Sequence, residues 1–167
     1  MRNISLLQIF YKSLYSFTDI AKFRFLSIGK TIQYVFILIC IYFVPSLINS
    51  IIIEKDSTNL IPDFDAGSVA IMLPIFIFFM FVLNTGILFL KVSILAYIAK
   101  GLANLLKRKL PYRLSWRLTA YSITLPTIIF GLEPLLPFTI PYGFFIDLAL
   151  TFFYIYASIN KMPVTKK

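Results

Sequence analysis

Two apolar runs, residues 32–53 and 69–90, constrain this chain more than any other feature of its sequence. Each run contains about 22 residues, and a helix needs about 20 residues to cross the hydrocarbon core of a bilayer. The chain is 59% hydrophobic and only 14% charged, whereas soluble domains are about 25% charged. The sequence therefore predicts an all-α integral membrane protein, with residues 1–167 forming a single polytopic domain.

Two further hydrophobic stretches predict a third span over about residues 115–132 and a fourth over about 141–160. The third span is short, and we expect Pro126 to interrupt its helix at mid-depth. Small residues recur along it at spacings of three and four, a pattern typical of a face that another helix approaches closely. This helix-packing stripe consists of Ala120, Thr124, Thr127 and Gly131.

The segment 91–117 between the second and third spans carries many cations and no acid. With four spans, all 16 Lys and Arg residues except Lys55 fall on one side of the membrane. Because cytoplasmic loops are enriched in Lys and Arg, we expect both termini and this basic segment to be cytoplasmic, in a cell membrane. The cations expected to contact anionic lipid headgroups are Lys100, Lys107, Arg108, Lys109, Arg113 and Arg117.

The N-terminal residues 2–17 have the periodicity of an amphipathic helix lying in the inner interface, and the pattern from Ser16 to Asp19 predicts the start of a second helix. A secretory signal is an alternative interpretation of the basic start. The apolar core that follows is longer than the 7 to 15 or so residues of a signal peptide, which favours a retained span. After the second span, the helix is expected to continue over 91–108 along the inner surface, with the ammonium of Lys91 in the headgroups, and to end at Pro111.

The segment 54–67 is acidic and predicts an external loop. A calcium site is the alternative, but the alternating carboxylates and distal glutamate of a calcium loop are missing. The segment 131–141, with Glu133, predicts a second external turn. The chain has one cysteine, Cys40, so no internal disulfide can form, and its basic patches lie beside apolar spans, which argues against a nucleic-acid partner.

Four stretches of the sequence carry a family resemblance, namely FYKSLYSFTDIAKFRFLSIGKTIQYVF, IPDF, FLKVSILAYIAKGL and KLPYRLSWRLTAYSITLPTIIF. They resemble the integral membrane proteins grouped as domain-of-unknown-function family 1189, some of whose members are labelled maltodextrin-utilisation proteins. The resemblance implies a multi-pass membrane protein with a larger extracytoplasmic segment between the first two spans, which is shortened here to residues 54–67. It implies no catalytic residue and no established activity.

Asp147 and Asn84 are the candidate intramembrane polar site, because polar groups within spans are costly and often functional. We expect no cation at the depth of Asp147, which would then be protonated or hydrogen-bonded to neighbouring helices. Asn84 is expected to join helices or to line a polar pocket. The chain has no histidine and no nucleophile or phosphate-loop motif, so the sequence predicts no catalytic residue, no metal site and no cofactor.

Two classes of function fit these features. The favoured one is a non-enzymatic accessory subunit that binds other membrane proteins, or further copies of itself, in a nutrient-uptake or cell-envelope assembly. The stripe on the third span and the inner amphipathic surface support it. The alternative is a small transporter or channel component in which Asp147 and Asn84 line the path.

Overall fold

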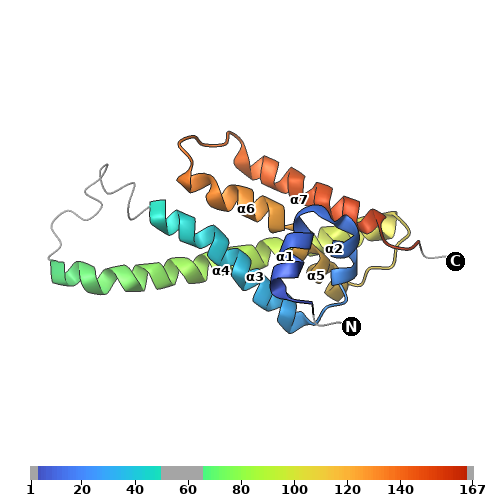
Figure 1. Ribbon diagram of the computed structural model, residues 1–167, viewed down its shortest axis with the longest axis horizontal. Coiled ribbons are helices and arrows are strands. Elements are labelled where there is room, and N and C mark those ends of the chain that lie inside the picture. Colours follow the sequence, from blue (N-terminus) through green and yellow to red (C-terminus); the bar gives the residue numbers. More distant parts are fainter. Residues whose placement is uncertain (1–3, 50–65, 165–167) are drawn as a thin grey trace.

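The computed structural model describes residues 4–49 and 66–164, and these residues form helices with no strand among them (Figure 1). Four of the described segments are long and apolar enough to cross a membrane, namely Ile28–Ile48, Ile71–Leu105, Tyr112–Leu135 and Gly143–Asn160. They correspond in order to the spans predicted from the sequence. The acidic segment 54–67 falls almost entirely outside the described residues.

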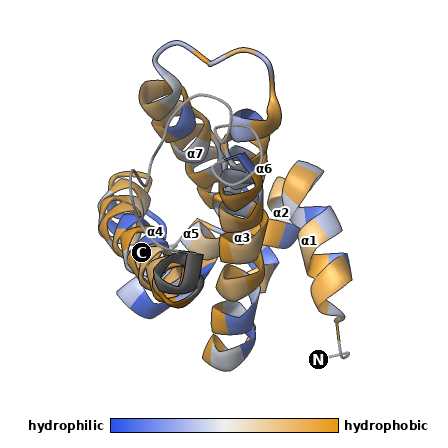
Figure 2. Ribbon diagram, turned by 90° about the vertical axis from the view of Figure 1, so that its left-hand side faces the viewer, coloured by the Kyte–Doolittle hydropathy of each residue, from blue (hydrophilic) through white to orange (hydrophobic). Residues whose placement is uncertain are grey.

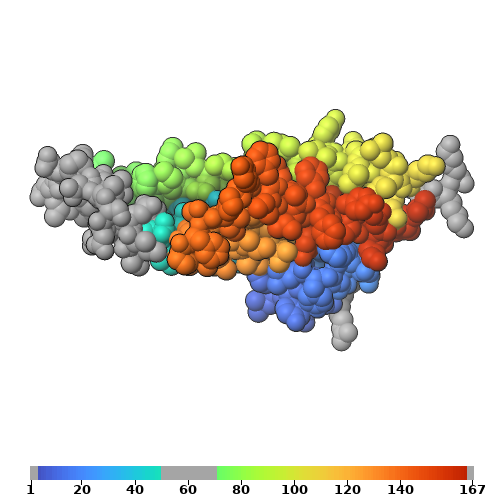
Figure 3. Space-filling view, turned by 90° about the horizontal axis from the view of Figure 1, so that it is seen from above, coloured from blue at the N-terminus to red at the C-terminus, as the bar shows by residue number. Residues whose placement is uncertain are grey.

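Two short helices, α1 (Leu6–Tyr15) and α2 (Phe17–Phe23), precede the first long helix. The predicted start of α2 is confirmed, because the Ser16 hydroxyl accepts the Asp19 N–H at 3.3 Å and donates to the Asp19 carboxylate at 3.1 Å. The two helices lie on one side of the bundle (Figure 3). The placement of α1 in a membrane interface stays a prediction.

The first long helix, α3, spans Ile28–Ile48, so it begins four residues before the apolar run. Ser27 supplies the start signal, since its hydroxyl accepts the Lys30 N–H at 3.4 Å. The apolar run thus marks the membrane-length core of the helix but not its first turn. The predicted end of this span, residues 50–53, lies outside the described residues.

The longest helix, α4, spans Ala66–Leu105 and contains 40 residues. It runs without a break through Lys91, which confirms that the helix continues beyond the apolar run. The prediction that Pro111 ends it is wrong. The helix ends at Leu105, where Lys107 takes a left-handed conformation with φ of 53° and the Arg108 N–H bonds to the Ala103 carbonyl at 2.8 Å, the arrangement of a Schellman cap.

The third span is divided into α5 (Tyr112–Ser122) and α6 (Thr124–Leu132), with the break at Ile123. The predicted interruption by Pro126 is therefore confirmed. A proline lacks an N–H and clashes with the carbonyl four residues earlier, which here belongs to Ser122. A short 3₁₀ helix, η3 (Glu133–Leu135), and a turn lead to α7 (Gly143–Asn160), the fourth span.

The core lies where α3 packs against α6 and α4 packs against α5. Besides apolar side chains it holds two hydroxyl pairs that join α3 to the α5–α6 segment. Tyr34 Oη lies 2.6 Å from Thr124 Oγ1, and Thr31 Oγ1 lies 3.0 Å from Tyr121 Oη. Most residues of the long helices are hydrophobic (Figure 2), and many of their large apolar side chains are exposed.

Candidate functional site

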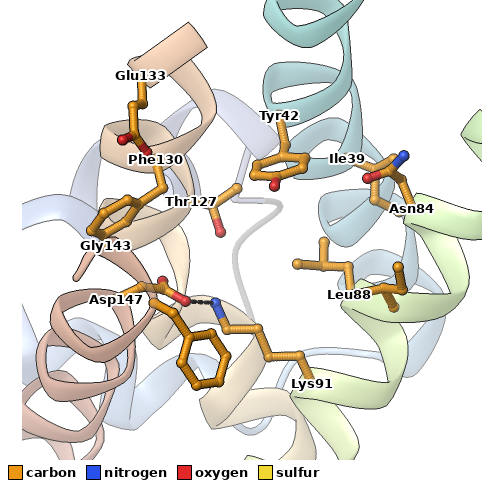
Figure 4. A pocket seen from close by; sticks show the side chains of 12 residues that line it. Ile39, Tyr42, Asn84, Leu88, Lys91, Thr127, Phe130, Glu133, Gly143 and Asp147 are labelled. Atoms are coloured by element: carbon orange, nitrogen blue, oxygen red, sulfur yellow. Dashed lines mark hydrogen bonds and ion pairs between the residues drawn. The ribbon is translucent and has the colours of Figure 1, made fainter. Parts of the chain in front are cut away.

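A cavity of about 370 Å³ lies between α3, α4, α6 and α7 (Figure 4). Its lining combines apolar side chains with a few polar groups, the composition typical of small-molecule sites. The polar and aromatic members are Tyr42, Asn84, Lys91, Thr127, Phe130, Glu133, Phe144 and Asp147. Both members of the predicted intramembrane polar site, Asp147 and Asn84, are thus brought to one cavity.

Asp147, on the second turn of α7, forms an ion pair with Lys91 of α4. Both side chains are largely buried, with 14% and 23% of their surface exposed. The expectation that Asp147 has no cation at its depth is wrong, because Lys91 is its partner. The helical path of α4 through Lys91 places the ammonium beside the beginning of α7, within the bundle. The position of Lys91 relative to lipid headgroups stays a prediction.

Two oxygen atoms in the cavity have no hydrogen-bond partner among the described residues. They are Oδ1 of Asp147 and Oγ1 of Thr127, both sealed from solvent. Thr127 is only 3% exposed, and its hydroxyl points into the cavity (Figure 4). A buried polar atom without a partner destabilises the protein by about 1–3 kcal/mol. Both residues line the cavity, so a donor that reached these atoms from the cavity would remove this cost.

Asn84 also lines the cavity, but its amide nitrogen donates to the Met80 carbonyl of its own helix at 2.8 Å. Glu133, the first residue of η3, accepts the Ile140 N–H at 2.8 Å through Oε1. This bond closes the turn between α6 and α7. Sequence reasoning assigned Glu133 to an external turn and did not connect it with Asp147.

Lys91, Thr127, Glu133 and Tyr42 are the site residues that sequence reasoning missed as members of the cavity. One signal could have identified Lys91. Ionisable residues within spans usually pair with one another, and Asp147 lies within the fourth span while Lys91 directly follows the second apolar run. This rule makes Lys91 a candidate partner of Asp147, although the apolar patterns place the two residues at opposite boundaries.

The helix-packing stripe is buried inside the molecule. Ala120, Thr124 and Thr127 are between 0% and 3% exposed, and Gly131 is buried against α3. A Cβ atom at Gly131 would lie 3.0 Å from the Tyr42 Cα and 3.2 Å from the Ile41 carbonyl oxygen. The helix that approaches this stripe is α3 of the same chain.

The basic residues of the segment 91–117 are divided by exposure. Lys107, Lys109 and Arg113 are exposed, whereas Lys100, Arg108 and Arg117 are half-buried. Arg117 donates to the Arg24 carbonyl at 3.4 Å, which joins α5 to the end of α2. Burial lowers the pKa of the Arg24 guanidinium. Contact of these cations with lipid headgroups stays a prediction.

The described residues contain no group of three or more His, Cys, Asp and Glu side chains that could hold a metal ion. The three acids described have different partners. Asp19 lies near Lys12 and Lys22, Glu133 accepts the Ile140 N–H, and Asp147 pairs with Lys91. What the cavity can do chemically is to bind a polar molecule of modest size, since it holds one ammonium, two carboxylates and a free hydroxyl.

The comparisons with known proteins give one result. A family model described as "Protein of unknown function (DUF1189)" matches the chain in two segments, residues 7–66 and 54–159. The two segments overlap within the acidic segment 54–67. No curated protein and no solved structure matches the chain.

Proposed function

This chain belongs to the DUF1189 family of proteins of unknown function, and we propose that it is a non-enzymatic multi-pass protein of the cell membrane that acts as a partner-binding subunit of a membrane complex. The complex would be a nutrient-uptake or cell-envelope assembly. The absence of histidine and of nucleophile or phosphate-loop motifs supports a function without catalysis.

The grouping of cations supports an orientation with both termini in the cytoplasm. Apart from Lys91, every described cation lies on or directly after α1 and α2, at the start of α3, near the end of α4, in the connection between α4 and α5, on α5 or directly after α7. Figure 1 places these elements toward one end of the molecule. Positive residues are retained on the cytoplasmic side during insertion, so this end is the inner one.

The observation that carries the proposal is the length of α4. The segment Ile71–Leu105 contains 35 residues, which corresponds to about 52 Å at 1.5 Å per residue. A hydrocarbon core is about 30 Å thick, and a tilt of 40° would shorten the projection of the helix only to about 40 Å. At least about 10 Å of this helix therefore lies outside the lipid core.

Large apolar side chains are exposed at both ends of α4. Ile75 and Phe78 near its start are 63% and 70% exposed, and Leu105 at its end is 82% exposed. The start of α4 extends beyond the turn between α6 and α7 (Figure 1). Lipid tails can cover one end of α4 but not both, and apolar surface that lipid does not cover is typical of contact with another protein.

Photocrosslinking from α4 tests the proposal. A photoreactive phenylalanine analogue in place of Phe78 should form crosslinks to another membrane protein or to a second copy in intact cells. The same analogue in place of Tyr34, which is buried in the core, is the matched control. Crosslinks to lipid alone from Phe78, with no protein product, would contradict the proposal.

A small transporter is the second candidate, and the cavity favours it. Asp147 and Asn84 line one space, and the ion pair with Lys91 allows a charged carboxylate to remain at depth. Asp147→Asn should abolish uptake into vesicles that contain the purified protein if this candidate is right. If uptake is absent from wild-type vesicles, the cavity belongs to a subunit that transports nothing alone.

A further inference from the structure

We propose that the cavity between α3, α4, α6 and α7 is a binding site for a small organic cation with a primary ammonium head and a short apolar tail. The proposal stands on the lining of the cavity. It does not depend on whether the protein acts as a subunit or as a transporter.

The charges of the lining favour a cation. The Lys91 ammonium is compensated by Oδ2 of Asp147, and Glu133 contributes a second carboxylate that no described cation contacts. The cavity therefore has one negative charge in excess. An anionic ligand would meet that excess in a site partly shielded from solvent, where electrostatic repulsion is stronger than in water.

The unpaired oxygens favour a head group that carries hydrogen-bond donors. Oδ1 of Asp147 and Oγ1 of Thr127 are both buried and have no hydrogen-bond partner within residues 4–49 and 66–164. An ammonium group has three N–H donors, so it can supply the donor that each of these oxygens lacks. A quaternary ammonium carries the charge but offers no donor, so it would leave both oxygens unpaired.

The arrangement of the walls favours a short apolar tail. Glu133, Thr127 and Asp147 come from the α6 and α7 side of the cavity, whereas Ile39 and Leu88 lie on the opposite side (Figure 4). The rings of Phe130 and Phe144 complete the lining. A ligand with its ammonium toward α6 and α7 would place its alkyl part against apolar side chains. The volume of about 370 Å³ is at the small end of ligand pockets.

Water is the competing occupant, because a polar cavity of this size can hold several ordered molecules. Three probes of matched size distinguish the two. Butylammonium, 1-butanol and butyrate each contain four carbons and differ in the charge and donors of the head. Binding is measured by isothermal titration to the full-length protein in nanodiscs, with empty nanodiscs subtracted to remove partition into lipid.

We expect saturable binding of butylammonium, binding of 1-butanol that is at least about tenfold weaker, which corresponds to about 1.4 kcal/mol, and no binding of butyrate. Glu133→Gln and Thr127→Val should each weaken the binding of butylammonium, because the first removes the excess charge and the second removes a free acceptor at nearly constant volume. Asp19→Asn, which removes an acid outside the cavity, should leave it unchanged.

Asp147→Asn is less suitable, since it also leaves Lys91 unpaired and can disturb the fold. Folding of each variant is checked by circular dichroism. The proposal is overturned if folded wild-type protein gives no saturable signal with butylammonium, in which case the cavity holds water only. It is also overturned if 1-butanol binds equally well, or if neither Glu133→Gln nor Thr127→Val has an effect.

Discussion

The Lys91 ammonium of α4 contacts the Asp147 carboxylate of α7 across 56 positions of sequence. Removal of either partner leaves a largely buried charge without compensation, which destabilises a protein by about 3–5 kcal/mol when burial is complete. Because both side chains keep some exposure, we expect about 2–4 kcal/mol for Lys91→Met or Asp147→Asn, measured as a lower unfolding midpoint in detergent by circular dichroism.

The double variant Lys91→Met/Asp147→Leu removes both charges together. It tests whether each single variant loses stability because the remaining charge has no partner. It should recover most of the stability that either single variant loses. Lys22→Met is the control, because Lys22 lies 3.8 Å from Asp19 and its side chain is 72% exposed. Its effect should be at most about 1 kcal/mol. A double variant as unstable as the sum of the single ones would argue against this account.

Gly131→Ala should destabilise the protein, because the added methyl group would lie 3.0 Å from the Tyr42 Cα. That neighbour is backbone and cannot rotate away, so α3 and α6 must separate slightly. We expect a loss of about 1–3 kcal/mol, measured by the same thermal unfolding in detergent. Gly86→Ala is the matched control, since nothing lies within 4 Å of its Cβ position, and it should be neutral or stabilising by up to about 1 kcal/mol.

The sequence predicts the membrane spans well because their signal is local. Apolar length identifies four spans, a hydroxyl three residues before an acid identifies the start of α2, and Pro126 identifies the break between α5 and α6. The end of α4 is different. A left-handed cap is normally indicated by glycine, and here Lys107 occupies it.

The candidate site is harder to predict from sequence because it depends on the relative level of the helices. The apolar pattern of α4 places Lys91 at the inner boundary, and that of α7 places Asp147 near the outer one. Neither pattern predicts how far α7 is shifted along α4, and this shift brings the two side chains together. The helix-packing stripe on α5 and α6 predicts a packing face, but it does not indicate whether the approaching helix is α3 or a helix of another protein.

Lys107→Gly should stabilise the protein. Lys107 has a φ of 53°, which disfavours residues with a Cβ by about 1–2 kcal/mol, and glycine adopts this conformation readily. Since glycine also loses more entropy on folding, we expect a net gain of about 0.5–1 kcal/mol, visible as a higher unfolding midpoint. Lys109→Gly, which removes the same charge at a position without positive φ, should not raise the midpoint.

Replacement of Lys107, Arg108 and Lys109 by Gln should reduce the amount of anionic lipid that the protein retains. Each cation near a membrane surface contributes about 1 kcal/mol to attraction for anionic headgroups. The measurement is mass spectrometry of phosphatidylglycerol bound to the full-length protein after extraction from mixed vesicles. Retention of zwitterionic lipid is the internal control. Equal retention of phosphatidylglycerol by variant and wild type would contradict a role for these cations.

Cysteine labelling in sealed cells tests the orientation of the whole bundle. Cys40 is exposed, so the variants are made with Cys40→Ser. A membrane-impermeant maleimide added outside should modify Pro134→Cys, in η3, and leave Lys109→Cys, between α4 and α5, unmodified until the membrane is opened. Asn59→Cys should also react from outside, although this position lies outside the described residues.

The expected labelling pattern follows from the grouping of cations at the end of the bundle that holds the α4–α5 connection. Labelling of Lys109→Cys in sealed cells would reverse the orientation of every span, because the four helices alternate in direction along one chain.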